Sequence, residues 1–121
     1  MIYTLTEHLN LQNNQLEGRL PRFNRKSRIE VLDLSGNSFT GPVESGIGFL
    51  RGLEVLNLRN NQLSGQVPLE LQKLTNLREL WLGENNLVGI ISEDICMLKE
   101  NGLEILETDC KRISNRVKCN C

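Results

Sequence analysis

Leucine recurs at every second position in four short stretches of the chain, and polar residues follow each stretch. The paired positions are Leu9/Leu11, Leu32/Leu34, Leu56/Leu58 and Leu80/Leu82. A spacing of two predicts a short β-strand that buries one face. Between these stretches the apolar spacing changes to three, at Ile47, Leu50 and Leu53 and again at Leu71, Leu74 and Leu77. That spacing predicts a 3₁₀ or short helical turn with one buried face.

The two patterns belong to one repeated unit. The segments EHLNLQNNQLEGRLP, IEVLDLSGNSFTGPV, LEVLNLRNNQLSGQVP and LRELWLGENNLVGII align with one another, and a decayed fifth unit, LEILETDC, begins at Leu103. Asn recurs at 14, 37, 61 and 85, and Gly recurs four positions later in each unit, with spacings of 23, 24 and 24 residues. Such agreement at a fixed period indicates a repeat architecture.

The recurrent Asn is expected to be structural. Each Asn stands where the chain turns after a strand, and its amide can donate to and accept from backbone groups left open there. Stacked units would align these side chains in a buried polar ladder, Asn14, Asn37, Asn61 and Asn85. Loss of one is expected to cost ~1–3 kcal/mol, the penalty for an unpaired buried group. The recurrent Gly permits a tight backbone path, and Pro21 and Pro68 begin an extended return.

A single unit cannot bury its own Leu face, whereas stacked units build a continuous core. The strands would then lie parallel on one side of a coil, and the turns and short helical segments on the other. Because the strand side is narrower, the coil bends and the strands form a concave wall.

These residues resemble the plant-type leucine-rich repeat, LxxLxLxxNxLxGxIPxxLxxLxx, over about residues 5 to 110. The third unit, LEVLNLRNNQLSGQVPLELQKLTN, matches nearly position by position, whereas Thr6, Glu44 and Ser92 depart from the pattern. The resemblance implies an α/β right-handed leucine-rich repeat solenoid, with one short parallel strand per repeat on the concave face and 3₁₀ or short helical turns on the convex face. It also implies two regions, repeats over 1–110 and a Cys-containing C-terminal cap over 96–121.

Residues next to the buried leucines point away from the core and form the expected partner-binding face. These are His8, Asn10, Gln12, Val31, Asp33, Ser35, Val55, Asn57, Arg59, Glu79 and Trp81. Neighbouring strands are ~4.8 Å apart, so four units span only ~15 Å. Such a wall supplies part of the about 800 Å² that a standard interface needs from each partner. A working binder is therefore expected to need more repeats.

Trp81 has two interpretations. As an outward residue on a concave sheet it is a candidate binding anchor, since Trp is enriched at interface hot spots. Alternatively, it covers neighbouring side chains or the cap. His8 is interpreted as a solvated strand residue, and the basic run over 22–28 as a solvated turn on the convex side. Glu30, Glu54 and Glu104 are interpreted as a solvated acidic edge without calcium.

Four cysteines, Cys96, Cys110, Cys119 and Cys121, lie in the last quarter of the chain. Their even number and clustering favour disulfides and an oxidising compartment. Free thiols and a zinc site remain alternatives, although no C-x₂-C pair is present. Disulfides tying the tail over the last unit would contribute ~2–4 kcal/mol each. The N-terminal end shows only Tyr3 and Leu5 as cover, so the chain is expected to be the C-terminal part of a longer array or a marginal stand-alone domain.

The formal net charge of −1 gives no general attraction to nucleic acid. No apolar run approaches the ~20 residues of a membrane span, and the N-terminus lacks the pattern of a signal peptide. No catalytic, phosphate-binding or metal-binding motif appears, so no enzyme activity, cofactor or metal is expected.

The leading hypothesis is a non-catalytic module of a receptor-like or secreted protein, extracellular or at the cell surface. It would recognise a protein or peptide through the concave sheet, and a full-length parent could be membrane-anchored. One alternative is a secreted inhibitor of a cell-wall-degrading hydrolase, which the same family fold supports. Others are a fragment with only a structural role and an intracellular scaffold.

Overall fold

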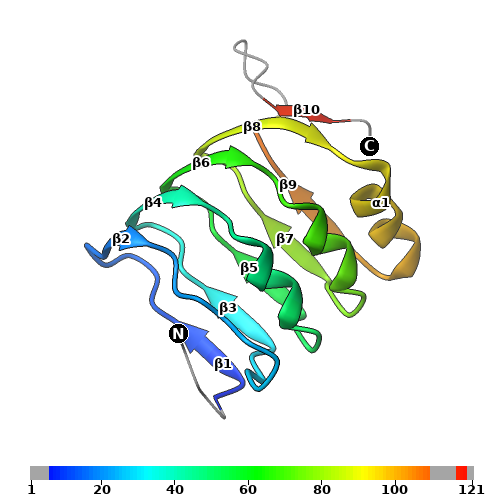
Figure 1. Ribbon diagram of the computed structural model, residues 1–121, viewed down its shortest axis with the longest axis horizontal. Helices are drawn as coiled ribbons and strands as arrows, with labels where there is room; N and C mark the ends of the chain where they lie inside the picture. The colour runs from blue at the N-terminus through cyan, green and yellow to red at the C-terminus, as the bar shows by residue number, and fades with distance from the viewer. Residues whose placement is uncertain (1–5, 110–116, 120–121) are drawn as a thin grey trace.

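The computed structural model describes residues 6–109 and 117–119. Its first sheet contains one three-residue strand from each unit, all parallel, in the order β1-β3-β5-β7-β9 (Figure 1). The bounds are β1 His8–Asn10, β3 Val31–Asp33, β5 Val55–Asn57, β7 Glu79–Trp81 and β9 Ile105–Glu107. The predicted solenoid with one strand of this kind per repeat is therefore confirmed.

The register of this sheet stacks equivalent residues of successive units. Leu9 pairs with Leu32, Leu32 with Leu56, Leu56 with Leu80, and Leu80 with Leu106. The three central leucines of this column are fully buried. The alternation in the sequence therefore separates a Leu column facing the core from polar columns facing outward.

A second parallel sheet, which the sequence pattern did not predict, runs in the order β10-β8-β6-β4-β2. Its strands are β2 Glu17–Arg19, β4 Ser38–Pro42, β6 Gln62–Gln66, β8 Asn86–Ile91 and β10 Val117–Cys119. In β4 and β6 one side chain each is buried, Phe39 and Leu63. A Gly with positive φ follows two residues later, Gly41 at 79° and Gly65 at 78°. One buried side chain produces no alternation, so these strands give no period-two signal.

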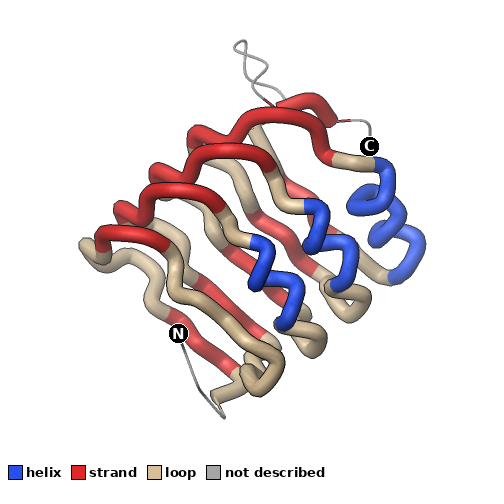
Figure 2. Tube along the Cα trace, viewed as in Figure 1, coloured by secondary structure: helices blue, strands red, loops and turns tan. Residues whose placement is uncertain are grey.

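Within units two to four, a helical segment follows the strand of the second sheet, at the point where apolar residues are spaced by three. The helical segments are η1 Ser45–Phe49, η2 Leu69–Lys73, α1 Glu93–Cys96 and η3 Met97–Asn101. Ile47 and Leu71 are buried within η1 and η2, so the predicted 3₁₀ turns are confirmed. The first unit has no helical segment in its return over residues 20–29, which runs as loop in Figure 2.

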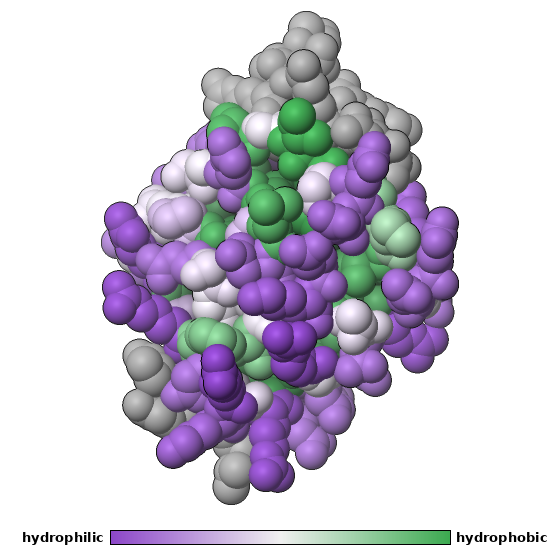
Figure 3. Space-filling model, turned by 45° about the vertical axis from the view of Figure 1, so that its right-hand side comes forward, coloured by the Kyte–Doolittle hydropathy of each residue, from purple (hydrophilic) through white to green (hydrophobic). Residues whose placement is uncertain are grey.

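The core fills the space between the two sheets and the helical segments as one cluster of buried side chains, from Phe23 to Leu103. It is aliphatic except for Phe23 and Phe39. The face shown in Figure 3 is largely hydrophilic, with hydrophobic residues exposed in groups among the polar ones. The stacked units therefore share a continuous core, as expected for a repeat array.

Asn61 shows how the recurrent Asn joins two units. Its Nδ2 donates to the carbonyls of Leu34 in the preceding unit (3.0 Å) and Leu58 in its own unit (3.2 Å). Its Oδ1 accepts from Phe39 N on the second sheet (3.1 Å). Asn37 and Asn85 make equivalent bonds, and all three side chains are buried.

Asn14 departs from the expected burial. It is exposed, and its Nδ2 donates only to the nearby carbonyls of Leu11 and Gln12. The reason is that no described unit lies before the first one, so the turn has no preceding unit against which to pack.

The expected division into repeats over 1–110 and a cap over 96–121 stays a prediction. Cys96 is disulfide-bonded. Cys110 and Cys121 lie outside the described residues, and of Cys119 only the backbone is described, as part of β10, which pairs with β8. The pairing of the four cysteines therefore also stays a prediction.

Candidate binding surface on the concave wall

The outward residues of the first sheet, together with the residues that follow each strand, form a surface that we call the concave wall. Strand register arranges it in columns. The central column contains Asn10, Asp33, Asn57, Trp81 and Glu107. The flanking positions hold His8, Val31, Val55, Glu79 and Ile105 on one side, and Gln12, Ser35, Arg59, Gly83 and Asp109 on the other. All eleven residues predicted for the partner-binding face lie on this surface.

Trp81 is the last residue of β7 and is half-buried. Its indole Nε1 donates to Oε2 of Glu79, two residues earlier on β7 (3.1 Å). Asn57 and Glu107 are its register partners on the neighbouring strands. Because Glu79 satisfies the indole N–H, Trp81 offers the wall an aromatic surface rather than an unpaired donor.

Asp33 organises the middle of the wall through neutral donors. Its Oδ1 accepts from the backbone N–H (3.0 Å) and the hydroxyl (2.6 Å) of Ser35. Its Oδ2 accepts from Asn57 Nδ2 on the next strand (3.3 Å). These bonds fix the side chain of Asp33 relative to Ser35 in the flanking column and Asn57 in the central column, which favours a preorganised surface.

Arg59 lies beside two carboxylates at the edge of the wall. Its Nη2 is 2.7 Å from Glu84 Oε1, and its Nε is 3.8 Å from Glu107 Oε1. The hydrogen bond to Glu84 and the charges of Glu84 and Glu107 raise the pKa of Arg59 above its ordinary value. Arg59 is exposed, so this network contributes little to stability and mainly fixes where the charges stand.

The decayed fifth unit completes the wall with acidic side chains. Glu107 Oε2 accepts from Gly83 N (3.1 Å), and Asp109 accepts from the backbone N–H groups of Glu84 (2.8 Å) and Asn85 (3.1 Å). One unit earlier, Asn61 N donates to a backbone carbonyl, that of Glu84. A Cβ at Gly83 would overlap the Glu107 carboxylate, so Gly at this position lets Glu107 approach.

Glu107 and Asp109 were absent from the residues predicted for this face. The signal that could have found them is the parity of the fifth unit, because Leu106 occupies the inward position and its neighbours must then point outward. The loss of the second Leu from this unit, where Thr108 stands, obscured that parity.

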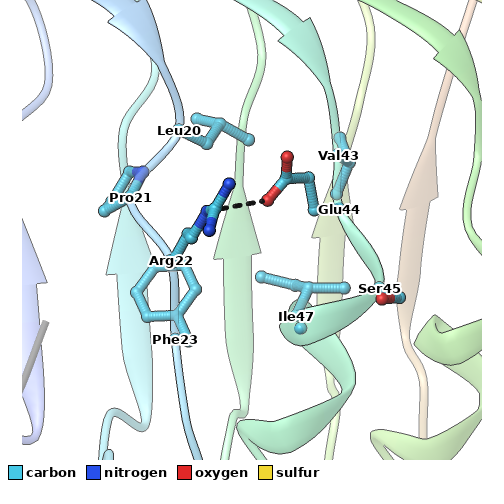
Figure 4. A pocket seen from close by; sticks show the side chains of 9 residues that line it. Leu20, Pro21, Arg22, Phe23, Val43, Glu44, Ser45 and Ile47 are labelled. Atoms are coloured by element: carbon cyan, nitrogen blue, oxygen red, sulfur yellow. Dashed lines mark ion pairs between the residues drawn. The ribbon is translucent and has the colours of Figure 1, made fainter. Parts of the chain in front are cut away.

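The hollows on the described surface include one at the wall and one away from it. A polar hollow of about 350 Å³ opens at the edge of the wall, lined by Asn13, Ser35, Gly36, Asn57, Arg59, Asn60 and Glu84. A more apolar hollow of about 440 Å³ lies away from the first sheet, between residues 20–23 and 43–47. Figure 4 shows Arg22 and Glu44 facing each other there, 3.6 Å apart.

The remaining candidates lie outside any cluster that could carry chemistry. His8 is exposed on the edge strand β1. Arg22, Arg25, Lys26 and Arg28 are exposed on the return of the first unit. Within residues 6–109 and 117–119, no group of His, Cys, Asp and Glu is placed to hold a metal ion. Across the same residues, no helix has the length and apolar character needed to cross a membrane.

Comparison with known proteins identifies the repeat. The family model described as leucine rich repeats (2 copies) matches residues 51–100, and the one described as leucine rich repeat matches residues 6–25 and 28–50. The receptor-like protein CLAVATA2 of Arabidopsis thaliana is 51% identical over 41 residues, which are 34% of this chain and 6% of CLAVATA2.

Solved structures give the same result. A crystal structure of PEPR1–AtPEP1 superimposes with a TM-score of 0.76 at 31% identity, over 84% of this chain and 14% of that one. The Arabidopsis receptor kinase HAESA, in complex with the peptide hormone IDA and the co-receptor SERK1, superimposes with a TM-score of 0.72 at 32% identity. That match covers 82% of this chain and 17% of HAESA, so the chain spans a small part of CLAVATA2, PEPR1 and HAESA. With four aligned units and a first sheet in the predicted register, the chain belongs to the plant-type leucine-rich repeat proteins.

Proposed function

We propose that this chain is a non-catalytic module that binds a protein or peptide across the concave wall, with Trp81 as the central contact. The observation that carries the proposal is the placement of Trp81. It points outward from β7, it is half-buried, and its N–H is already bonded to Glu79. A large rigid side chain held in this way can lose its remaining exposed surface to a ligand at little cost in conformational entropy.

The solved relatives support the same function. One is a structure of PEPR1 with AtPEP1, and another is HAESA with a peptide hormone and a co-receptor. Their ligands are peptides or proteins, and this chain shares their fold at about 30% identity. Inhibition of a secreted hydrolase stays a prediction, because no contact on the wall specifically favours it.

The same proposal places the chain outside the cell or at its surface. Cys96 is disulfide-bonded, and structural disulfides form and persist in oxidising compartments. CLAVATA2, with which the chain shares a segment of high identity, is a receptor-like protein.

The test is a selection of peptides from a random display library on the immobilised 121-residue chain. Dissociation constants of the recovered peptides are then measured for the parent chain and for Trp81→Ala. We expect the dissociation constant to rise at least about 30-fold, which corresponds to a hot spot of about 2 kcal/mol. The melting temperature should barely move, because Trp81 does not belong to the buried core cluster.

Met97→Ala is the matched control, since Met97 is a large apolar residue exposed at the start of η3. It should leave the dissociation constants unchanged. If Trp81→Ala lowers stability strongly and binding persists, Trp81 is a packing residue and the proposal is wrong.

A further inference from the structure

Charge on the concave wall is strongly one-sided. Five carboxylates stand on it or in the loops that follow its strands, belonging to Asp33, Glu79, Glu84, Glu107 and Asp109, against one guanidinium, that of Arg59. The exposed bases of the first unit, by contrast, lie away from the wall, Arg19 on β2 and the others on the return segment over residues 22–28. The wall therefore carries a local excess of negative charge, although the formal net charge of the chain is only −1.

The single base of the wall is already engaged within the protein. Arg59 lies between Glu84 and Glu107, at 2.7 and 3.8 Å. Arg78 precedes Glu79 in sequence, but its Nη2 bonds to Glu104, 2.9 Å away and outside the wall. Neither guanidinium is left to receive an anionic ligand without breaking an existing ion pair.

Two of the wall carboxylates meet only neutral donors within hydrogen-bond distance. Glu79 accepts from the indole of Trp81. Asp33 accepts from Ser35 and Asn57. Neither takes part in an ion pair within the described part of the chain. Because neither is paired with a cation of the protein, both can serve as counter-ions for a ligand.

Trp81 stands between two carboxylates. Glu79 holds the N–H edge of the indole from the same strand, and Glu107 is the register partner of Trp81 on β9. A Lys ammonium or an Arg guanidinium placed over the ring would be attracted by its π face. The same cation would lie within reach of carboxylates on both sides, since adjacent strands are only ~4.8 Å apart.

We propose that the concave wall is selective for a cationic peptide segment, which places a Lys or Arg side chain on Trp81 with Glu79 as its counter-ion. Glu107, which already lies 3.8 Å from Arg59, is a second carboxylate near the ring. This inference rests on the proposed function. The outward Trp81 and the wall around it define the site, and the carboxylates determine the charge of the ligand. Charge complementarity of this kind contributes to partner choice and to the rate of association.

The test uses the peptides recovered from the display library. We expect them to be enriched in Lys and Arg relative to the unselected library. Their affinity should fall as the salt concentration is raised from about 50 to about 500 mM, because the Debye screening length shortens to about 4 Å over this range. Glu79→Gln is the decisive variant, because the Gln side-chain oxygen can still accept from the indole N–H while the charge is lost. It should weaken binding by about fivefold or more and reduce the salt dependence.

Glu100→Gln is the matched control, since Glu100 is exposed in η3 away from the wall. The same change of charge there should leave binding unaltered. A peptide whose Lys or Arg is replaced by an uncharged residue should lose more affinity for the parent chain than for Glu79→Gln, in which only the attraction to the Trp81 ring remains.

Two outcomes separate the inference from the proposed function. Recovered peptides that require Trp81 but carry no excess of Lys or Arg, and that bind Glu79→Gln as well as the parent chain, would overturn the cationic class and leave the binding function intact. If no recovered peptide depends on Trp81, the proposed function fails and the inference fails with it.

Discussion

Asp109 accepts the backbone N–H of Asn85 through its carboxylate (3.1 Å), whereas Asn61, one unit earlier, donates its N–H to a backbone carbonyl. A side chain of the decayed fifth unit therefore closes the turn of the fourth. The same carboxylate accepts from Glu84 N (2.8 Å). Hydrogen bonds to an ionised acceptor are stronger than neutral ones, so two donors at the last complete turn depend on one residue.

Asp109→Ala is expected to destabilise the chain by about 2–3 kcal/mol, because two donors lose a charged acceptor. Asp109→Asn should cost less, because the amide oxygen can replace one of the two acceptors. Urea denaturation followed by circular dichroism measures both. Equal effects of the two substitutions, or a change below about 0.5 kcal/mol for Asp109→Ala, would contradict the assignment.

Asn61→Ala is expected to cost about 2–3 kcal/mol, because it removes a buried amide and leaves the carbonyls of Leu34 and Leu58 and the N–H of Phe39 without that partner. Asn14→Ala is the matched comparison. It removes an exposed amide that bonds only within its own turn, so it should cost less than about 1 kcal/mol. Equal costs would show that the ladder does not depend on bonds between units.

Gly65→Ala tests whether the second sheet depends on backbone conformation rather than on space. Gly65 has φ +78°, and the nearest atom to an added Cβ is Pro42 Cβ at 3.8 Å. Space is thus sufficient, but the left-handed conformation disfavours a side chain by about 1–2 kcal/mol. Thermal unfolding should show this loss for Gly65→Ala and almost none for Ser64→Ala, its exposed neighbour in β6.

Arg59→Gln is expected to tighten the binding of a cationic peptide while hardly changing stability. The ion pairs of Arg59 are exposed and contribute little to folding, but their loss frees the carboxylates of Glu84 and Glu107 for a ligand. Titration of a Lys-containing peptide should give a lower dissociation constant than for the parent chain. Weaker binding would mean that Arg59 itself contacts the ligand.

Much of this architecture is encoded in recurrent leucines, and those parts were predictable. Leu32, Leu56 and Leu80 mark the first sheet, and Ile47 and Leu71 mark the 3₁₀ turns. The second sheet was missed because Phe39 and Leu63 are each the single buried residue of their strand, which leaves no alternation to detect.

The alternation of inward and outward residues along each strand predicted the residues of the concave wall, except those of the fifth unit at its acidic end. Glu107 was missed because Thr108 replaces the Leu that fixes the inward face in the other units. The hollow between Leu20 and Ile47 was also not predictable, because it lies where the first unit lacks the helical segment that the next three units possess. A missing element leaves no sequence pattern of its own.

The reach of each buried Asn into the preceding unit gives the array a gradient of local stability. Asn37 and Asn61 each bond to the unit before their own, whereas Asn14 bonds only within its own turn. In a nearest-neighbour description of repeat proteins, the first unit is therefore coupled to the rest of the described array through the second unit alone. Hydrogen exchange at Leu11 and Asn13 should proceed by opening of this unit alone, and exchange at Leu58 and Asn61 should require cooperative unfolding of several units.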